Sequence, residues 1–162
     1  MTIDHLLLQR EAEFHPADVS ALEPVHSELD RFWDDVKPLL VPSVPDKWKM
    51  EFEIALSEVC ANIIKHAFAG FSQPGTMVLH LRLYKDRVEA HFSDDGTPFN
   101  EESGTETLTL GPFADLPESG RGLQVARALL DTLHYQRSQE SNNNWLLVKI
   151  LPKQGSRTRS LK

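Results

Sequence analysis

The chain has 162 residues, a formal net charge of −7, 40% hydrophobic residues and 25% charged residues, a composition typical of a globular protein that is large enough to bury a core. The acidic balance argues against a protein body that binds nucleic acid, and no apolar run approaches the roughly 20 residues that span a bilayer. A single cysteine, Cys60, excludes a disulfide framework and favours a cytoplasmic location.

We expect one domain over residues 1–152, followed by a basic tail over residues 153–162. The tail carries four basic and no acidic side chains, together with glycine and serine. Such a segment is typical of a disordered end. It is either a solvated end or a docking element, and we expect the first.

The N-terminal half predicts a strand and two helices. We expect a strand over residues 6–14, and apolar residues at helical spacing indicate a helix over about 20–40. Pro38, Pro42 and Pro45 then break the chain. Asp46 is expected to cap a second helix that runs to about residue 68.

The C-terminal half predicts a hairpin, a long loop, a third helix and two last strands. These are expected at residues 77–84, 88–93, 96–119, 120–133, 134–137 and 145–151. The order predicts an α+β fold: a two-layer sandwich in which helices cover one face of a mixed, mostly antiparallel sheet. A loop of this length in a compact domain is usually functional or mobile.

The second helix carries polar residues that a plain amphipathic helix does not require. One stripe is apolar: Leu56, Cys60, Ile63 and Ala67. Near the opposite side lie Glu58, Asn62, Lys65 and His66. Asn is a poor helix former, but its carbonyl oxygen suits Mg²⁺, and a carboxylate one turn away is placed to accept a proton. The alternative is a solvated polar face.

Two glycine motifs follow. Asp94-Asp95-Gly96 ends a strand, where a carboxylate can accept a hydrogen bond from an exocyclic amine such as that of adenine, while Gly96 permits close approach of a ring. A simple turn is the alternative. Gly120-Arg121-Gly122 precedes a helix and predicts an anion site suited to phosphate. It matches neither the Walker pattern nor Gly-x-Gly-x-x-Gly, so a generic helix start is its alternative.

The three motifs together resemble the N, G1 and G2 boxes of the GHKL ATPase superfamily, over residues 6–151. The short form most resembles the bacterial anti-sigma-factor serine/threonine kinases. The resemblance implies a Bergerat-type ATP pocket in which Asn62 holds Mg²⁺, Glu58 is the catalytic base and Asp94 binds the adenine amine. Residues 97–119 would form the ATP lid. The other box residues assigned to the nucleotide are Lys65, His66, Gly96, Pro98, Phe99, Gly120, Arg121, Gly122 and Leu123.

The reaction that the resemblance implies is transfer of the ATP γ-phosphoryl group to a serine or threonine of a STAS-type anti-anti-sigma protein. The kinase would otherwise sequester a sigma factor, and dimerisation is common in the family. Neither nucleic acid nor a membrane is an expected partner. The main alternative is a non-catalytic ATP-binding module of a partner-switching system. A clamp ATPase is disfavoured because the chain has no transducer domain.

Overall fold

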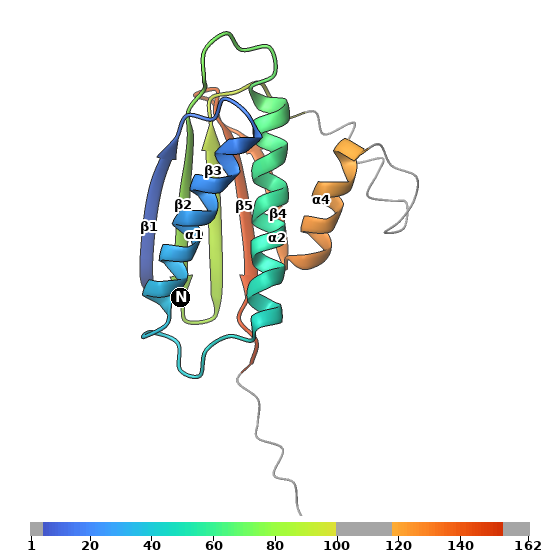
Figure 1. Cartoon of the computed structure of the whole chain (residues 1–162). Coiled ribbons are helices and arrows are strands. Elements are labelled where there is room, and N and C mark those ends of the chain that lie inside the picture. The colour runs from blue at the N-terminus through green and yellow to red at the C-terminus, as the bar shows by residue number, and fades with distance from the viewer. Residues whose placement is uncertain (1–4, 100–117, 154–162) are drawn as a thin grey trace, which may run out of the picture.

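The computed structural model describes residues 5–99 and 118–153 (Figure 1). The elements, in chain order, are β1 (Leu6–Phe14), the 3-10 turn η1 (Val19–Ala21), α1 (Leu22–Val36), α2 (Asp46–Asn62), the π-helical turn η2 (Ile63–Ala67), β2 (Met77–Tyr84), β3 (Arg87–Asp94), α4 (Glu118–Leu129), β4 (Thr132–Arg137) and β5 (Asn143–Ile150).

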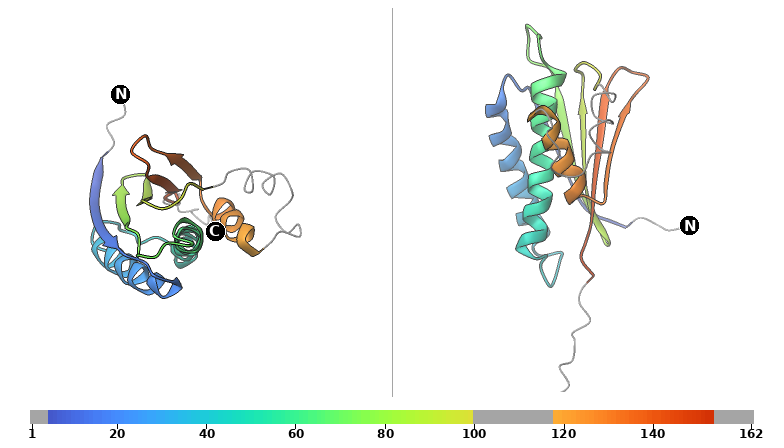
Figure 2. Two further views of the ribbon diagram at one scale, coloured as in Figure 1. Left: turned by 90° about the horizontal axis from the view of Figure 1, so that it is seen from above. Right: turned by 90° about the vertical axis from the view of Figure 1, so that its right-hand side faces the viewer.

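The strands form one sheet in the order β1-β2-β3-β5-β4, and every pair of neighbours is antiparallel. Helices α1, α2 and α4 all lie on the same face of this sheet (Figure 2). Helix α2 packs between α1 and α4, with α1 toward β1 and α4 toward β4. The predicted α+β sandwich is therefore confirmed, with a sheet that is antiparallel throughout its described strands.

The core lies between the sheet and the helices. Inward-facing residues of β2 and β3 alternate with half-exposed ones, as the period of two along a strand requires. They meet the predicted apolar stripe of α2 and η2, all of whose members are buried. Burial raises the pKa of the Cys60 thiol to about 12, so this cysteine packs as a small apolar side chain.

Aromatic side chains join α1 to α2. The rings of Trp48 and Phe52 are stacked with centroids 6.3 Å apart, and Trp33 meets Phe52 edge-on at 5.9 Å. The indole N–H of Trp48 donates to the carbonyl of Ile150 at 2.9 Å, which ties the start of α2 to the end of β5. All three tryptophans of the chain are buried, as expected for packing residues.

Several predicted boundaries are wrong by a few residues. Helix α1 ends at Val36, because Pro38 has no N–H to continue the helix. Asp46 is the first residue of α2 rather than its cap, which is Pro45. Helix α4 begins at Glu118 and ends at Leu129, so the following strand starts earlier than predicted. The predicted α2 extends to residue 67 through η2, where the hydrogen bonding becomes π-helical.

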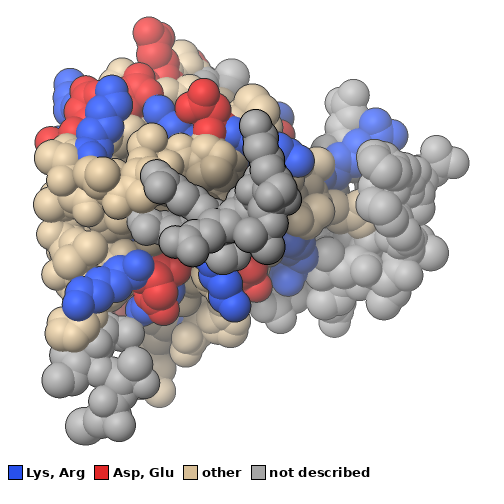
Figure 3. All heavy atoms as spheres, turned by 90° about the horizontal axis from the view of Figure 1, so that it is seen from below, with Lys and Arg blue, Asp and Glu red and all other residues tan. Residues whose placement is uncertain are grey.

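Among residues 5–99 and 118–153, no helix is long and apolar enough to cross a membrane. On the face of the molecule shown in Figure 3, basic and acidic side chains are interspersed rather than gathered into a patch of one sign. Residues 154–162 of the expected tail lie outside the described residues.

Phe52→Ala should lower the free energy of unfolding by about 3–5 kcal/mol, because it removes a fully buried ring from between two tryptophans. Urea unfolding monitored by tryptophan fluorescence measures the change. Leu39→Ala is the matched control, since that side chain is 45% exposed and should change stability by less than about 1 kcal/mol. Equal losses in the two variants would contradict this account of the core.

Candidate functional site

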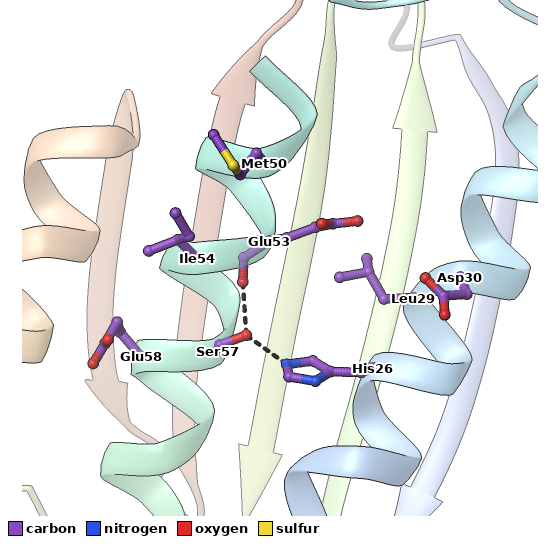
Figure 4. A pocket seen from close by; sticks show the side chains of 8 residues that line it. All are labelled: His26, Leu29, Asp30, Met50, Glu53, Ile54, Ser57 and Glu58. Carbon is purple, nitrogen blue, oxygen red and sulfur yellow. Dashed lines mark hydrogen bonds between the residues drawn. The ribbon is translucent and has the colours of Figure 1, made fainter. Parts of the chain in front are cut away.

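Glu58 lies where α2 faces α4. Its side chain points away from α1 and toward α4 (Figure 4). A Cβ added to Gly122 of α4 would collide with the Glu58 carboxylate oxygen Oε2 and lie 3.3 Å from its Cδ. The absence of a side chain at position 122 is therefore what allows this carboxylate to lie against the backbone of α4. The structure thus brings together the acid of the helix motif and the second glycine of the last motif.

Asn62 is the last residue of α2 and is buried, although the helical spacing placed it on the polar side. It lies one turn after Glu58, on the same side of the helix. Its carbonyl oxygen is a hard ligand of the kind that Mg²⁺ takes beside phosphate oxygens and water. No group of three or more His, Cys, Asp or Glu side chains within residues 5–99 and 118–153 could hold a metal by itself. A cation here would therefore depend on Asn62 and on ligands from a bound phosphate chain.

Asp94 ends β3 and is only 2% exposed. Its Oδ1 accepts hydrogen bonds from the backbone N–H of Gly96 at 2.9 Å and from the Asn143 side-chain amide at 2.8 Å. Its Oδ2 is buried and has no hydrogen-bond partner among the described residues. Burial raises the pKa of this carboxyl, and the two hydrogen bonds oppose that shift. An oxygen of this kind fits a ligand amine, because a donor from outside would complete its hydrogen bonding.

A polar network holds Asp94 in place. The Asn143 amide also donates to the carbonyl of Thr97 at 2.8 Å. Its side-chain oxygen accepts from the Tyr135 hydroxyl and from the Arg137 guanidinium. Arg137 donates in addition to the carbonyl of Gly96 at 2.9 Å. The network fixes the turn after β3 from both strands of the β4–β5 pair.

The same turn is held against the end of the α2–η2 helix. The backbone N–H of Thr97 donates to the carbonyl of Ala67 at 2.8 Å. A Cβ added to Gly96 would lie 2.5 Å from that carbonyl oxygen and 2.6 Å from the Ala67 Cβ. Gly96 is therefore required for the contact between the turn and the helix, and this contact sets Asp94 relative to Asn62.

The glycines of the last motif lie inside α4 and not ahead of it. Because α4 begins at Glu118, Gly120 falls in the first turn, whose N–H groups are unsatisfied within a helix. Gly122 comes one position too late to contribute a free N–H, so its contact with Glu58 is its evident role. Arg121 is exposed and Leu123 packs against the core.

The remaining predicted site residues are not gathered with these. Lys65 and His66 are exposed on η2, and Pro98 is exposed after the turn. The Phe99 ring packs against Trp145 with centroids 5.0 Å apart, and its backbone N–H donates to the Tyr135 hydroxyl at 3.0 Å. Of the expected lid, residues 100–117 lie outside the described residues.

Sequence reasoning missed Asn143, Tyr135 and Arg137. The position of Asn143 could have been found from the sequence. It is two residues before Trp145 and four before Leu147, so the period of two along a strand puts all three on the inner face of β5. A buried amide on that face needs partners. The pattern gave no such signal for the other two.

A hollow of about 410 Å³ lies on the outer face of α2, beside Glu58 (Figure 4). It is lined by His26, Leu29, Asp30, Met50, Glu53, Ile54, Ser57 and Glu58. The Ser57 hydroxyl donates to the carbonyl of Glu53 at 2.8 Å and lies 2.7 Å from the His26 Nε2. Glu58 thus faces α4 on one side and borders this hollow on the other.

Comparison with known proteins matches the chain to a protein family. The model of the histidine kinase-like ATPase domain matches residues 27–149. Curated relatives include the serine-protein kinase RsbW of Halalkalibacterium halodurans, 35% identical over 50% of this chain and 51% of the relative. That of Bacillus licheniformis is 26% identical over 71% of this chain and 66% of the relative. The alignments thus span from half to two thirds of the relatives' length.

Among solved structures, the mycobacterial sensor histidine kinase MprB is similar with a TM-score of 0.49 and 14% identity, over 89% of this chain and 98% of that one. The family match covers most of the chain and includes the elements that carry Glu58, Asn62, Asp94 and Gly122. The chain therefore belongs to the histidine kinase-like ATPase domain family, of the GHKL type, and is similar to the RsbW serine-protein kinases.

Proposed function

We propose that the chain is an ATP-dependent serine/threonine protein kinase that acts as a cytoplasmic anti-sigma factor in a bacterial partner-switching pathway. It would phosphorylate a STAS-type anti-anti-sigma protein and otherwise bind a sigma factor. The names of its relatives support a serine-protein kinase. The observation that carries the proposal is the half-satisfied Asp94 carboxylate at one end of α2–η2, with Glu58 further along the same helix against α4.

The nucleotide would bind between Asp94 and Glu58. The Asp94 Oδ2 would accept a hydrogen bond from the adenine amine, and Gly96 would leave room for the ring. Asn62 and the first turn of α4 would face the phosphates. Mg²⁺, when bound, would neutralise phosphate charge, with Asn62 as its ligand from the protein. Pro98 and Phe99, beside Gly96, and Lys65 and His66, on η2, remain proposed nucleotide contacts.

Glu58 would act on the acceptor. A carboxylate at hydrogen-bond distance from the acceptor hydroxyl takes up its proton as the oxygen bonds to the γ-phosphorus and the β–γ bridging bond breaks. The backbone of α4 at Gly122 would hold the carboxylate in one orientation. Positioning is a main source of rate enhancement in such transfers.

Glu58→Gln should keep Mg²⁺-dependent ATP binding and lose at least about a hundredfold in phosphoryl transfer, because it removes the base and retains the shape. Asn62→Ala should lose the Mg²⁺-dependent part of ATP binding. Calorimetry with and without Mg²⁺ measures binding, and transfer of labelled phosphate to a co-expressed acceptor protein measures activity. If the wild type bound ATP without transferring phosphate, the non-catalytic ATP-binding module would be favoured. If it bound no ATP, both the kinase and the ATP-binding module would be ruled out.

Asp94→Asn should weaken ATP binding about ten- to a hundredfold. The hydrogen bond from the adenine amine to a charged carboxylate would be lost, and the amine would instead face the N–H group of the Asn side chain, which is also a donor. In the wild type, the preference for ATP over inosine triphosphate should fall as the pH drops through the raised pKa of Asp94, since protonation of Oδ2 turns the acceptor into a donor. The ratio of the two dissociation constants, measured from pH 4 to 8, cancels titration of the phosphates. A preference that does not change with pH would contradict the assignment of Asp94.

Gly122→Ala should reduce transfer by at least about tenfold, because the new methyl group displaces the Glu58 carboxylate. Alanine favours a helix over glycine by roughly 1 kcal/mol, so the melting temperature should not fall much. ATP affinity should change less than the transfer rate. Wild-type transfer by this variant would show that Glu58 does not need its present position.

A further inference from the structure

The hollow on the outer face of α2 combines apolar surface with negative charge. Met50 and Ile54, one turn apart on α2, are 54% and 39% exposed although both are large apolar side chains. The buried Leu29 of α1 lies beside them in the lining. Clustered apolar exposure of this kind is typical of a surface that another molecule covers.

Carboxylates line the same hollow: Asp30 of α1 and Glu53 and Glu58 of α2. No Lys or Arg is among the described residues that line it. Lys49, one turn before Glu53, is directed to the Trp33 ring, with its Nζ 5.5 Å from the ring centroid. The charge that would complement this surface is therefore positive.

The hollow is held in shape by a hydrogen bond between its two helices. The Ser57 hydroxyl gives its proton to the carbonyl of Glu53, so the His26 Nε2 at 2.7 Å is the donor to Ser57. This link joins α1 to α2 at the residue immediately before Glu58. Apolar surface and carboxylates are thus presented at fixed positions relative to the proposed base.

We propose that this hollow binds the protein segment that carries the phosphoacceptor serine or threonine, and that it selects a segment with a lysine or arginine and an apolar residue near the acceptor. The inference rests on the proposed function, because it takes Glu58 as the base. The segment would lie along α2 with its hydroxyl at Glu58, its basic side chain between Asp30 and Glu53, and its apolar side chain on Met50 and Ile54.

Helix geometry sets the spacing that the segment needs. Glu53 precedes Glu58 by five residues, which is about 7.5 Å along the helix axis. An extended segment advances about 3.3 Å per residue, and the two side chains also project about 140° apart around the helix, so the basic residue should lie about two to five positions from the acceptor. Met50 is about 12 Å from Glu58 by the same measure, which puts the apolar residue about four positions away on the same side.

The test uses the full chain, Mg²⁺ and labelled ATP with a library of synthetic peptides that have one fixed serine and every other position varied. The wild type should label peptides with Lys or Arg two to five positions from the serine in preference to neutral ones. Asp30→Asn/Glu53→Gln should reduce labelling of the basic peptides about five- to tenfold, as expected for two partly exposed charge pairs. Asp34→Asn/Glu140→Gln is the control, since it changes net charge equally with exposed acids outside the hollow.

Each other outcome overturns the proposal. Labelling with no basic preference, or equal losses in the two double variants, would leave the kinase function intact and remove the hollow as its recognition surface. Failure to label any peptide while ATP still binds and a whole acceptor protein is still phosphorylated would show that no segment is recognised here. Loss of ATP binding in the wild type would instead refute the proposed function itself.

Discussion

The Asp94 carboxylate loses water from both of its oxygens on folding, but within the described part of the chain only one of them gains hydrogen bonds. A buried polar atom left without a partner costs roughly 1–3 kcal/mol, and the raised pKa of Asp94 reflects the burial. The cost is sustained because Asn143 and Arg137 over-determine the position of the turn after β3. The remaining oxygen therefore keeps a fixed direction, and a ligand donor can bind it without reorganising the protein.

Helix α2 connects the turn that holds Asp94 to the part of the fold where Glu58 faces α4. Its buried stripe fixes the rotation of the helix on the sheet, and that rotation decides where Glu58 and Asn62 lie. The turn with Gly96 then contacts the carbonyl of Ala67 at the helix end. One packed helix thus sets the proposed adenine end and the proposed catalytic end relative to each other. A site built in this way on a helix and strands is held more precisely than one built on loops.

The sequence predicted what depends on local spacing and missed what depends on distant pairing. Period-two alternation in β2 and the helical stripe through Cys60 gave the elements and their buried faces. The bond between Asn143 and Asp94 joins residues 49 positions apart, so no local pattern contains it. The predicted start of α4, residue 120, is two residues late, and the contact that explains Gly122 is with Glu58, 64 positions earlier in the chain.

The two sides of Glu58 differ in charge, and this difference separates the two substrates of the proposed reaction. Toward α4, the proposed phosphate site at the first helical turn would favour an anion. Toward the hollow, Asp30 and Glu53 would repel an anion and attract the proposed basic segment. A nucleotide phosphate that entered the hollow would meet carboxylates, with no lysine or arginine among the described lining residues. In-line transfer requires the attacking and leaving oxygens to lie on opposite sides of the γ-phosphorus, with the base beside the attacking hydroxyl. In the proposed reaction, the sign of the field would bring ATP from the α4 side and the acceptor from the hollow, so that the γ-phosphorus and the hydroxyl meet next to Glu58.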